Sequence, residues 1–182
     1  RQGPRHFRRG SEGRPPVALS LTGSGPLSGL DLALTLDADG ERTLTGEMAL
    51  RRQADGLAWD TNLGGPIARL IPAQFRDFFG SETRLSANGV SLDAGGMRLD
   101  ALNLDSGALD LTATAETSAD SFLRRLNLKA TLDDGTNGSV ILPVPGGETT
   151  VNRADFTLSF GESANEEWTG LLTVKDLATA EF

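Results

Sequence analysis

Cysteine and tyrosine are absent from this chain of 182 residues, and histidine occurs once, at His6. Without cysteine the chain forms no disulfide, no thiolate zinc site and no cysteine nucleophile. A serine nucleophile needs a base, and the single histidine lies in a tail without hydrophobic periodicity, so a Ser-His-Asp triad is excluded as well. The residues for ordinary solution catalysis are therefore almost absent, and we expect no enzyme, no metal site and no cofactor.

Long hydrophobic runs are also missing. No apolar stretch approaches the roughly 20 residues of a membrane helix, and no hydrophobic signal begins the sequence. A signal or anchor, if the protein is exported or anchored, lies outside this sequence. The first segment, 1–14, contains five Arg and one Glu, and it is interpreted as a disordered basic linker or remnant.

Acidic residues outnumber basic residues in the rest of the chain. Of the 17 basic and 25 acidic residues in total, 12 and 24 lie in 15–182, which gives this body a net charge of −12. A phosphate-binding surface needs clustered cations, so we expect no nucleic-acid partner for the body.

What the sequence does contain is a period-two alternation of Leu and Val with polar residues, which restarts after short separators such as Asp39-Gly40 and Gly95-Gly96. Successive side chains of a strand point to opposite faces, so each segment has one apolar and one polar face. The turn-type separators and the lack of helical periodicity between strands predict an all-β fold, a long antiparallel meander of hairpins. The predicted strands are 17–22, 30–37, 43–51, 56–64, 83–90, 96–105, 108–116, 122–133, 139–144, 150–160 and 167–177.

One segment, 66–79, breaks the alternation and places its apolar residues at roughly helical spacing. Pro72 is unfavourable inside a helix, so we predict either a kink or a new short helix that begins there and is ended by Gly80. One interpretation is an amphipathic element that touches a membrane or a partner. The other is a plug that covers an open end or edge of the sheet, which is favoured because the segment is short and lacks a lysine-rich polar face.

Neighbouring carboxylates occur at the turns, for example Asp37 with Asp39. Asp37 to Gly40 resembles the opening of a calcium loop but lacks the later oxygen ligands, so a hairpin turn is the simpler interpretation. Glycoside hydrolysis needs two carboxyls that face each other across a bond, usually beside aromatic sugar platforms. Trp59 and Trp168 are the only tryptophans. The sequence therefore shows neither the facing carboxylates nor the aromatic residues expected of an all-β enzyme acting on polysaccharide.

Several phrases of strand and turn resemble those of a known family. They are LTGSGPLSGL at 21–30, IPAQFRDFFG at 71–80, LNLDSGALDL at 102–111, LPVPGG at 142–147 and WTG at 168–170. Through these phrases nearly all of 15–182 resembles the diverged hairpin repeats of the AsmA-like family, in its TamB branch of inner-membrane translocation and assembly subunits. Family members are much longer, so the chain is interpreted as an internal fragment.

The resemblance implies both a fold and a function. It implies a sheet curled into an apolar groove of the β-taco type that spans the periplasm, in a full-length protein anchored in the inner membrane. Such a groove would shield and conduct phospholipid or other acyl-chain cargo between the inner and outer membranes, or assist outer-membrane protein assembly and secretion. An outer-membrane barrel partner of the TamA type would bind parts of the protein that this sequence does not contain.

The candidate groove residues are apolar positions of four predicted strands: Leu30, Leu32, Leu34, Leu36, Leu109, Leu111, Leu126, Leu128, Phe156, Leu158 and Phe160. Two alternatives stay open for them. They form a closed dry core, or they belong to a secreted β-sandwich or adhesin-like binding or structural module in which two sheets bury these faces against each other. A slip of one residue in register would exchange the two faces of a strand.

Overall fold

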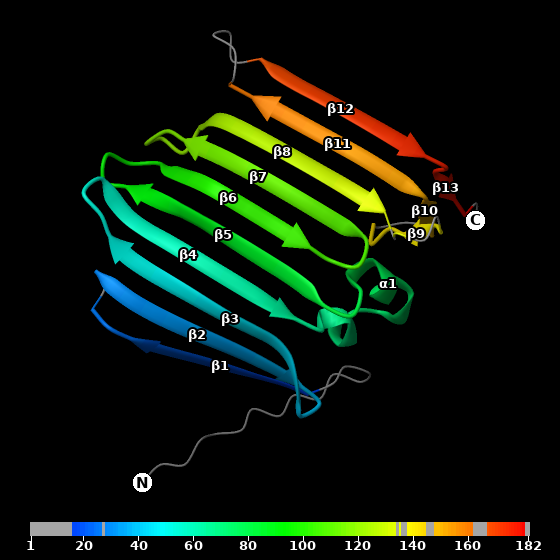
Figure 1. Cartoon of the computed structure of the whole chain (residues 1–182), viewed down its shortest axis with the longest axis horizontal. Helices are drawn as coiled ribbons and strands as arrows, with labels where there is room; N and C mark the ends of the chain where they lie inside the picture. Colours follow the sequence, from blue (N-terminus) through cyan, green and yellow to red (C-terminus); the bar gives the residue numbers. More distant parts are fainter. Residues whose placement is uncertain are drawn as a thin grey trace.

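A computed structural model describes residues 16–26, 28–133, 135, 138–144, 148–161 and 167–180. The expected basic linker at 1–14 lies outside these residues. Within them the chain forms an antiparallel sheet of ten strands, and this meander confirms the predicted all-β class (Figure 1). The strands are β1 Val17–Ser24, β2 Gly29–Ala38, β3 Glu41–Arg52, β4 Gly56–Gly65, β5 Thr83–Leu92, β6 Met97–Asp105, β7 Leu109–Thr117, β8 Leu123–Asp133, β11 Arg153–Phe160 and β12 Trp168–Lys175.

Tight hairpin turns form where Asp and Gly interrupt the alternation. Between β2 and β3, Asp39 and Gly40 have φ of 54° and 81°. A two-residue I′ turn requires positive φ at both central positions, a region that Gly, Asn and Asp reach most easily. The longer turn between β5 and β6 also contains two glycines with positive φ, Gly95 and Gly96. Both predicted separators are therefore confirmed as turns.

The register of the sheet places apolar residues of neighbouring strands directly opposite one another. Leu36 of β2 pairs with Leu19 of β1 and with Leu44 of β3, and Leu128 of β8 pairs with Leu158 of β11. Directly paired residues of antiparallel strands point to the same face. The sheet therefore gathers apolar side chains on one face and polar side chains on the other, although irregularities in the β2–β3, β5–β6–β7 and β7–β8 pairings shift the alternation locally.

The meander is interrupted between β8 and β11, which pair directly with each other. The chain between them forms β9 (Val140–Ile141) and β10 (Thr149–Val151), which leave the large sheet. They pair with each other and, through β10, with β13 (Ala178–Thr179) in a small sheet of three strands. Figure 1 shows this small sheet at one end of β8, β11 and β12.

Three predicted strands are consequently wrong in extent. The predicted strand 139–144 is reduced to β9, which stops before Pro143, a residue without an N–H for the ladder. The predicted strand 150–160 is divided at Asn152, where the chain changes from the small sheet to the large one. The predicted strand 167–177 contains only β12, and the chain then turns into β13.

The segment between β4 and β5 forms short helical turns. These are η1 (Ile67–Leu70), η2 (Ala73–Phe75) and α1 (Arg76–Phe79). η2 begins directly after Pro72, whose fixed φ suits the start of a helical turn, and Gly80 ends α1 with φ of 68°. The prediction of a new short helix at Pro72, ended by Gly80, is confirmed.

These helical turns lie at one end of the strands, as the plug interpretation predicts. The amides of Ala108 and Gly107, in the turn between β6 and β7, donate to the carbonyls of Phe78 and Phe79 at 3.0 and 3.1 Å. The hydroxyl of Thr83 donates to the Phe79 carbonyl at 3.0 Å. The carbonyls at the end of a helix have no partner within it, so these bonds both satisfy α1 and fix it to the sheet.

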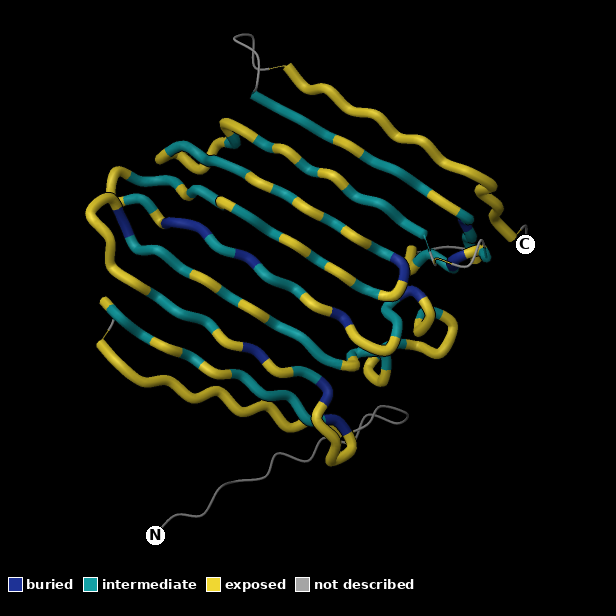
Figure 2. Tube along the Cα trace, in the orientation of Figure 1, coloured by how far each residue is buried: buried dark blue, intermediate teal, exposed yellow. Residues whose placement is uncertain are grey.

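Few side chains are fully buried, because the large sheet is a single layer (Figure 2). The buried side chains among the described residues are Ala38, Thr43, Phe78, Thr83, Ala87, Val90, Ala108, Val140 and Val151. All of them except Ala87 and Val90 lie at the end of the strands that carries the helical turns. The described elements therefore build a compact core at this end and leave the rest of the sheet open.

Candidate functional site: an uncovered apolar face

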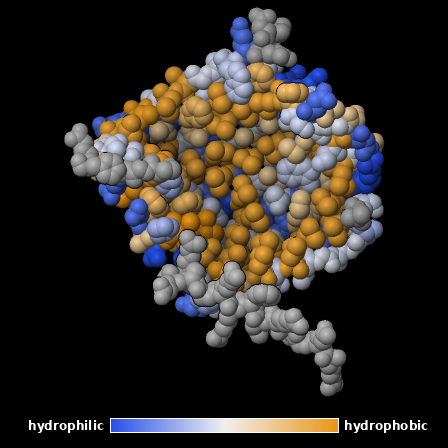
Figure 3. Space-filling model, turned by 180° about the vertical axis from the view of Figure 1, so that it is seen from behind, coloured by the Kyte–Doolittle hydropathy of each residue, from blue (hydrophilic) through white to orange (hydrophobic). Residues whose placement is uncertain are grey.

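One face of the large sheet is apolar across its whole width, and we call it the apolar face. Figure 3 shows this face, where apolar side chains form an almost continuous surface over the strands. It contains contributions from every strand of the sheet, from Leu19 and Leu21 of β1 to Leu172 and Val174 of β12. No described element lies over its centre, so apolar side chains there remain partly exposed.

The candidate groove residues all lie on this apolar face. Leu30, Leu32, Leu34 and Leu36 belong to β2, and the remaining candidates belong to β7, β8 and β11. The register joins the second group closely, because Leu128 pairs with Leu158 and Leu126 pairs with Phe160. The strands β3 to β6 separate the β2 group from the others. Each candidate is half-buried, which is less than the burial of a closed dry core.

The residues that join the two groups were not among the candidate groove residues. They are Leu44, Met48 and Leu50 of β3, Leu57, Trp59 and Leu63 of β4, Leu85 and Ala87 of β5, and Leu99, Leu102 and Leu104 of β6. The register irregularity between Leu99 and Leu102 shifts the alternation in β6. Gly46 and Thr61 also stand at apolar-face positions, so strict alternation of large apolar residues fails in these strands. A search that tolerated one small or polar residue at an apolar-face position, or one bulge, in each strand would have found them.

Large side chains on the apolar face fit because glycines lie opposite them. Trp59 pairs with Gly89, where an added Cβ would lie 2.7 Å from the Trp59 ring. At the other side of the sheet, Phe160 and Trp168 are direct partners whose rings stack with centroids 4.4 Å apart. Both tryptophans therefore lie on the apolar face, and Trp168 remains 56% exposed.

The two outer strands are the most exposed part of the apolar face. Leu19 of β1 is 65% exposed and Leu172 of β12 is 61% exposed. Each of these strands pairs with a single neighbour in the sheet, so one backbone edge of each has no strand beside it among the described residues. An edge with apolar side chains and free backbone groups is a ready partner for another strand.

One end of the apolar face is closed by a cluster of aromatic and aliphatic side chains. We call the helical turns 67–79 together with 140–142 the cap. Phe78 of the cap is buried against Ala108 and Val140, and Phe79 and Leu142 pack beside it. Two further residues in this cluster, Leu109 and Leu132, are direct partners on the apolar face. The cap therefore seals the apolar face at its β7–β8 end.

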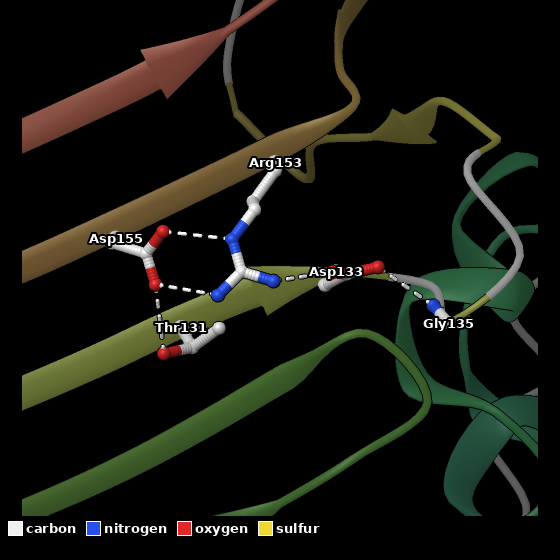
Figure 4. Close-up of polar contacts among 5 residues, drawn as sticks. All are labelled: Thr131, Asp133, Gly135, Arg153 and Asp155. Carbon is white, nitrogen blue, oxygen red and sulfur yellow. Dashed lines mark hydrogen bonds and ion pairs between the residues drawn. The ribbon is translucent and has the colours of Figure 1, made fainter.

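The opposite face, which we call the polar face, carries ion pairs and short polar side chains. Arg153 of β11 is the centre of one cluster and donates to Asp155 at 2.8 and 2.9 Å and to Asp133 at 2.7 Å (Figure 4). The Thr131 hydroxyl donates to Asp155 at 3.2 Å, and the Gly135 amide donates to Asp133 at 2.8 Å. These contacts fasten β8 to β11 where the chain leaves the large sheet.

The ion pairs shift the pKa values of their members. The hydrogen bonds from Arg153 hold the pKa of Asp155 below its ordinary value, and the hydroxyl of Thr131 acts in the same direction. A hydrogen bond from Arg52 likewise lowers the pKa of Asp93. All four charged groups are solvent-exposed, so their pairing contributes modestly to stability.

The polar face has shallow depressions between its rows of side chains. One, with a volume of about 670 Å³, is lined by Thr45, Glu47, Asn62, Arg84 and Ser86, among others. Within the described ranges, no group of three or more His, Cys, Asp or Glu residues is placed to hold a metal ion. The chemistry that the arrangement supports best is adsorption of apolar molecules to the apolar face while the polar face stays in water.

No helix in the described part of the chain is both long enough and apolar enough to cross a membrane. Comparison of the chain with protein-family models, with curated proteins and with solved structures finds no match.

Proposed function

We propose that the chain is a segment of a TamB-like, periplasm-spanning protein that supports outer-membrane biogenesis. The observation that carries the proposal is the apolar face, which is continuous over ten strands and over whose centre the described residues place no second layer. Monomeric soluble proteins rarely leave so wide an apolar surface open unless it meets another molecule. In this proposal the sheet curls into a groove, and phospholipid acyl chains move along it between the inner and outer membranes.

Burial of acyl chains supplies the driving force for this function. Removing a methylene from water is worth about 0.8 kcal/mol, so a chain of roughly 15 methylenes gains on the order of 10 kcal/mol when fully buried. A chain that lies on one open face keeps about half of its surface in water, and its gain falls to roughly 5 kcal/mol. Curling of the sheet would recover much of the difference, and headgroups would stay hydrated throughout.

Assistance to outer-membrane protein assembly is a second candidate, favoured by the exposed edges of β1 and β12. An unfolded strand with an apolar face pairs readily with such an edge. Both functions use the same sheet, but they use different surfaces. The first depends on side chains of the central strands, and the second depends on the backbone of the outer ones.

The proposal is tested by photo-crosslinking in bacterial cells that produce the full protein. A photoreactive amino acid is placed at Leu34, Leu111 or Leu128 on the apolar face. The matched controls are Thr35, Thr112 and Asn127, each of which is the sequence neighbour of a probe on the polar face. Lipid adducts are then identified by mass spectrometry.

We expect phospholipid adducts at the three Leu positions and none at the three controls. Two further probes, at Leu19 of β1 and Leu172 of β12, test the second candidate. Adducts to unfolded outer-membrane proteins at these two positions, without lipid at the other Leu positions, would support it. Absence of adducts at both sets, together with a compact protease-resistant fragment, would overturn the groove and favour a binding module in which another layer covers the apolar face.

A further inference from the structure

The two ends of the strands differ in chemistry. One end carries the cap, where most of the buried side chains gather. We call the other end, with the turns 53–55, 93–96 and 118–122, the open end. There is no comparable cluster of buried side chains at the open end, within the part of the chain that the structure describes. A molecule on the apolar face would therefore meet hydrocarbon at one end and solvent at the other.

An ion pair lies at the open end on the side of the apolar face. Arg52 continues the apolar-face positions of β3 two residues after Leu50, and it pairs with Leu57 of β4. Asp93 stands two residues after Ser91, which is the partner of Leu57 on β5. The guanidinium holds the carboxylate with two nitrogens, one of them at 2.7 Å. The pair therefore reaches from β3 to β5 across the end of β4.

The neighbouring arginine provides a contrast. Arg51 lies on the polar face and forms its ion pair there with Asp31. Arg52 and Asp93 are half-exposed, with 51% and 49% of their side-chain surface accessible. The exposed part of each group can therefore contact a ligand while the ion pair stays formed, and together they present one positive and one negative charge beside an apolar surface.

Between this ion pair and the cap, the strands β4 and β5 carry no charged side chain on the apolar face. β4 and β5 contain ten residues each, and at about 3.3 Å per residue they span roughly 33 Å. Their apolar-face positions include Leu57, Trp59, Leu63, Leu85 and Ala87. The hydrocarbon core of a bilayer, which holds two acyl chains end to end, is about 30 Å thick. One acyl chain therefore fits along this ladder with room to spare.

On the basis of the proposed function, we infer that a bound phospholipid lies along the strands, with its acyl-chain ends toward the cap and its zwitterionic headgroup at Arg52 and Asp93. Asp93 accepts from one N–H of each terminal nitrogen of Arg52, and the three other N–H groups of the guanidinium can donate to phosphate oxygens. The carboxylate accepts hydrogen bonds from an ammonium group. A headgroup with both charges, such as phosphoethanolamine, complements this ion pair, whereas a purely anionic headgroup meets repulsion from Asp93.

The orientation is tested with two photoreactive phospholipids. One carries a diazirine near the terminal methyl of an acyl chain, and the other carries it near the glycerol. The intact protein is loaded with each lipid, and the labelled residues are mapped by mass spectrometry. We expect the methyl-end probe to label Phe78, Phe79 and Leu142, and the glycerol-end probe to label Leu57 and Trp59. Identical labelling by both probes on the apolar face would overturn the orientation and leave the proposed function intact, whereas no labelling of this face would contradict the proposed function itself.

The headgroup site is tested with variants of the ion pair. We expect Arg52→Gln to weaken retention of phosphatidylethanolamine roughly fivefold, which corresponds to about 1 kcal/mol, and we expect Asp93→Asn to shift preference toward phosphatidylglycerol. Arg51→Gln is the matched control on the polar face and should retain all lipids equally. Diacylglycerol, which lacks a charged headgroup, should bind every variant alike.

Two outcomes would overturn the headgroup site. One is an equal loss of phosphatidylethanolamine in Arg52→Gln and Arg51→Gln. The other is an equal loss of diacylglycerol and phosphatidylethanolamine in a folded Arg52→Gln variant, since that would show that Arg52 does not act on the headgroup. The double variant Arg52→Asp/Asp93→Arg restores an ion pair with exchanged charges, so it should regain retention of phosphatidylethanolamine relative to Arg52→Gln.

Discussion

Single glycines determine where the apolar face accepts large side chains. Gly89 lies opposite the Trp59 ring, and Gly46 lies opposite Leu63, whose side chain occupies the place that a Cβ would take. Glycine weakens a strand through its backbone entropy, and the strand tolerates it here because the neighbouring side chain fills the space. The sequence signal for this arrangement is an isolated glycine inside an alternating run.

Gly89→Ala is expected to destabilise the fold. The new Cβ would lie 2.7 Å from the Trp59 ring and closer still to the Arg98 carbonyl, so the ring and the backbone would have to move. Forced overpacking of this kind typically lowers the free energy of unfolding by 1–3 kcal/mol. Urea unfolding followed by tryptophan fluorescence measures it. The matched control, Gly64→Ala, places its Cβ no closer than 3.7 Å to Arg84 and Thr83 and should change stability by less than about 0.5 kcal/mol.

Asp155 is expected to make stability depend on pH in the acid range. Arg153 lowers the pKa of Asp155 in the folded protein, so the ionised carboxylate stabilises the fold above the pKa of the unfolded chain, about 3.9. This contribution is lost as the pH falls through the folded-state pKa. Asp155→Asn should therefore be less stable than the parent at pH 7, and the difference should shrink below about pH 4. The non-titrating control on the same face of β11, Ser159→Ala, should show no such pH dependence in urea unfolding; a constant difference for Asp155→Asn would refute the assignment.

At the scale of elements, the cap is the part of the molecule that resembles an ordinary hydrophobic core. It joins the chain between β4 and β5 to the chain after β8, although these segments are far apart in sequence. Phe78 is its largest buried side chain, with 8% exposure. Its packing gives this end of the sheet a cluster of buried side chains, which the described turns of the open end lack.

Phe78→Ala is expected to detach the cap from the turn between β6 and β7. Truncation of a buried Phe typically lowers the free energy of unfolding by 3–5 kcal/mol, and the small size of this cluster places the expected value near the lower limit. Hydrogen exchange should show lost protection at Gly107 and Ala108, whose amides bond to α1. Phe122→Ala makes the same chemical change at a residue that is 74% exposed and should leave both measurements unchanged. Equal effects of the two variants would contradict the role given to the cap.

Elements with an uninterrupted local pattern were predictable, and those that depend on distant pairing were not. The strands β2, β7 and β8 follow strict alternation over long stretches, and Pro72 and Gly80 bound the helical turns by local backbone rules. The pairing of β8 with β11 skips two strands, and no local pattern encodes it. The candidate residues on β2, β7, β8 and β11 follow from alternation, whereas the bulge in β6 hides the continuation of the apolar face.

At the scale of the whole molecule, the outer strands are the part of the sheet that pairs most readily with another chain. β12 carries apolar side chains on both faces, since Leu172 lies on the apolar face and Leu171, 65% exposed, lies on the other. Natural sheets usually protect such edges with charge, proline or a bulge. The only charged side chain of β12 is Lys175, at its end. The edge is therefore open to another strand.

Leu171→Lys is expected to reduce self-association of the chain. A charge in the middle of the edge strand makes a second strand unfavourable there, while loss of an exposed Leu changes stability by less than about 0.5 kcal/mol. Sedimentation velocity over a range of concentrations measures association. Thr112→Lys places the same charge on the polar face of the inner strand β7 and should have little effect on association. If both variants reduce self-association equally, then the net charge of the chain controls association and the β12 edge does not.

The continuous antiparallel order of the ten strands also allows the sheet to be extended by further hairpins. Because the number is even, β1 and β12 run in opposite directions, and a further hairpin can join at either edge without a crossover connection. Each hairpin would lengthen the apolar face by about 9.6 Å, twice the spacing between strands. Each new strand would contact its neighbours alone, so its stability would depend on local pairing and little on total length. The extent of such a sheet across its strands can thus be set in steps of one hairpin to match the distance that the protein has to cover.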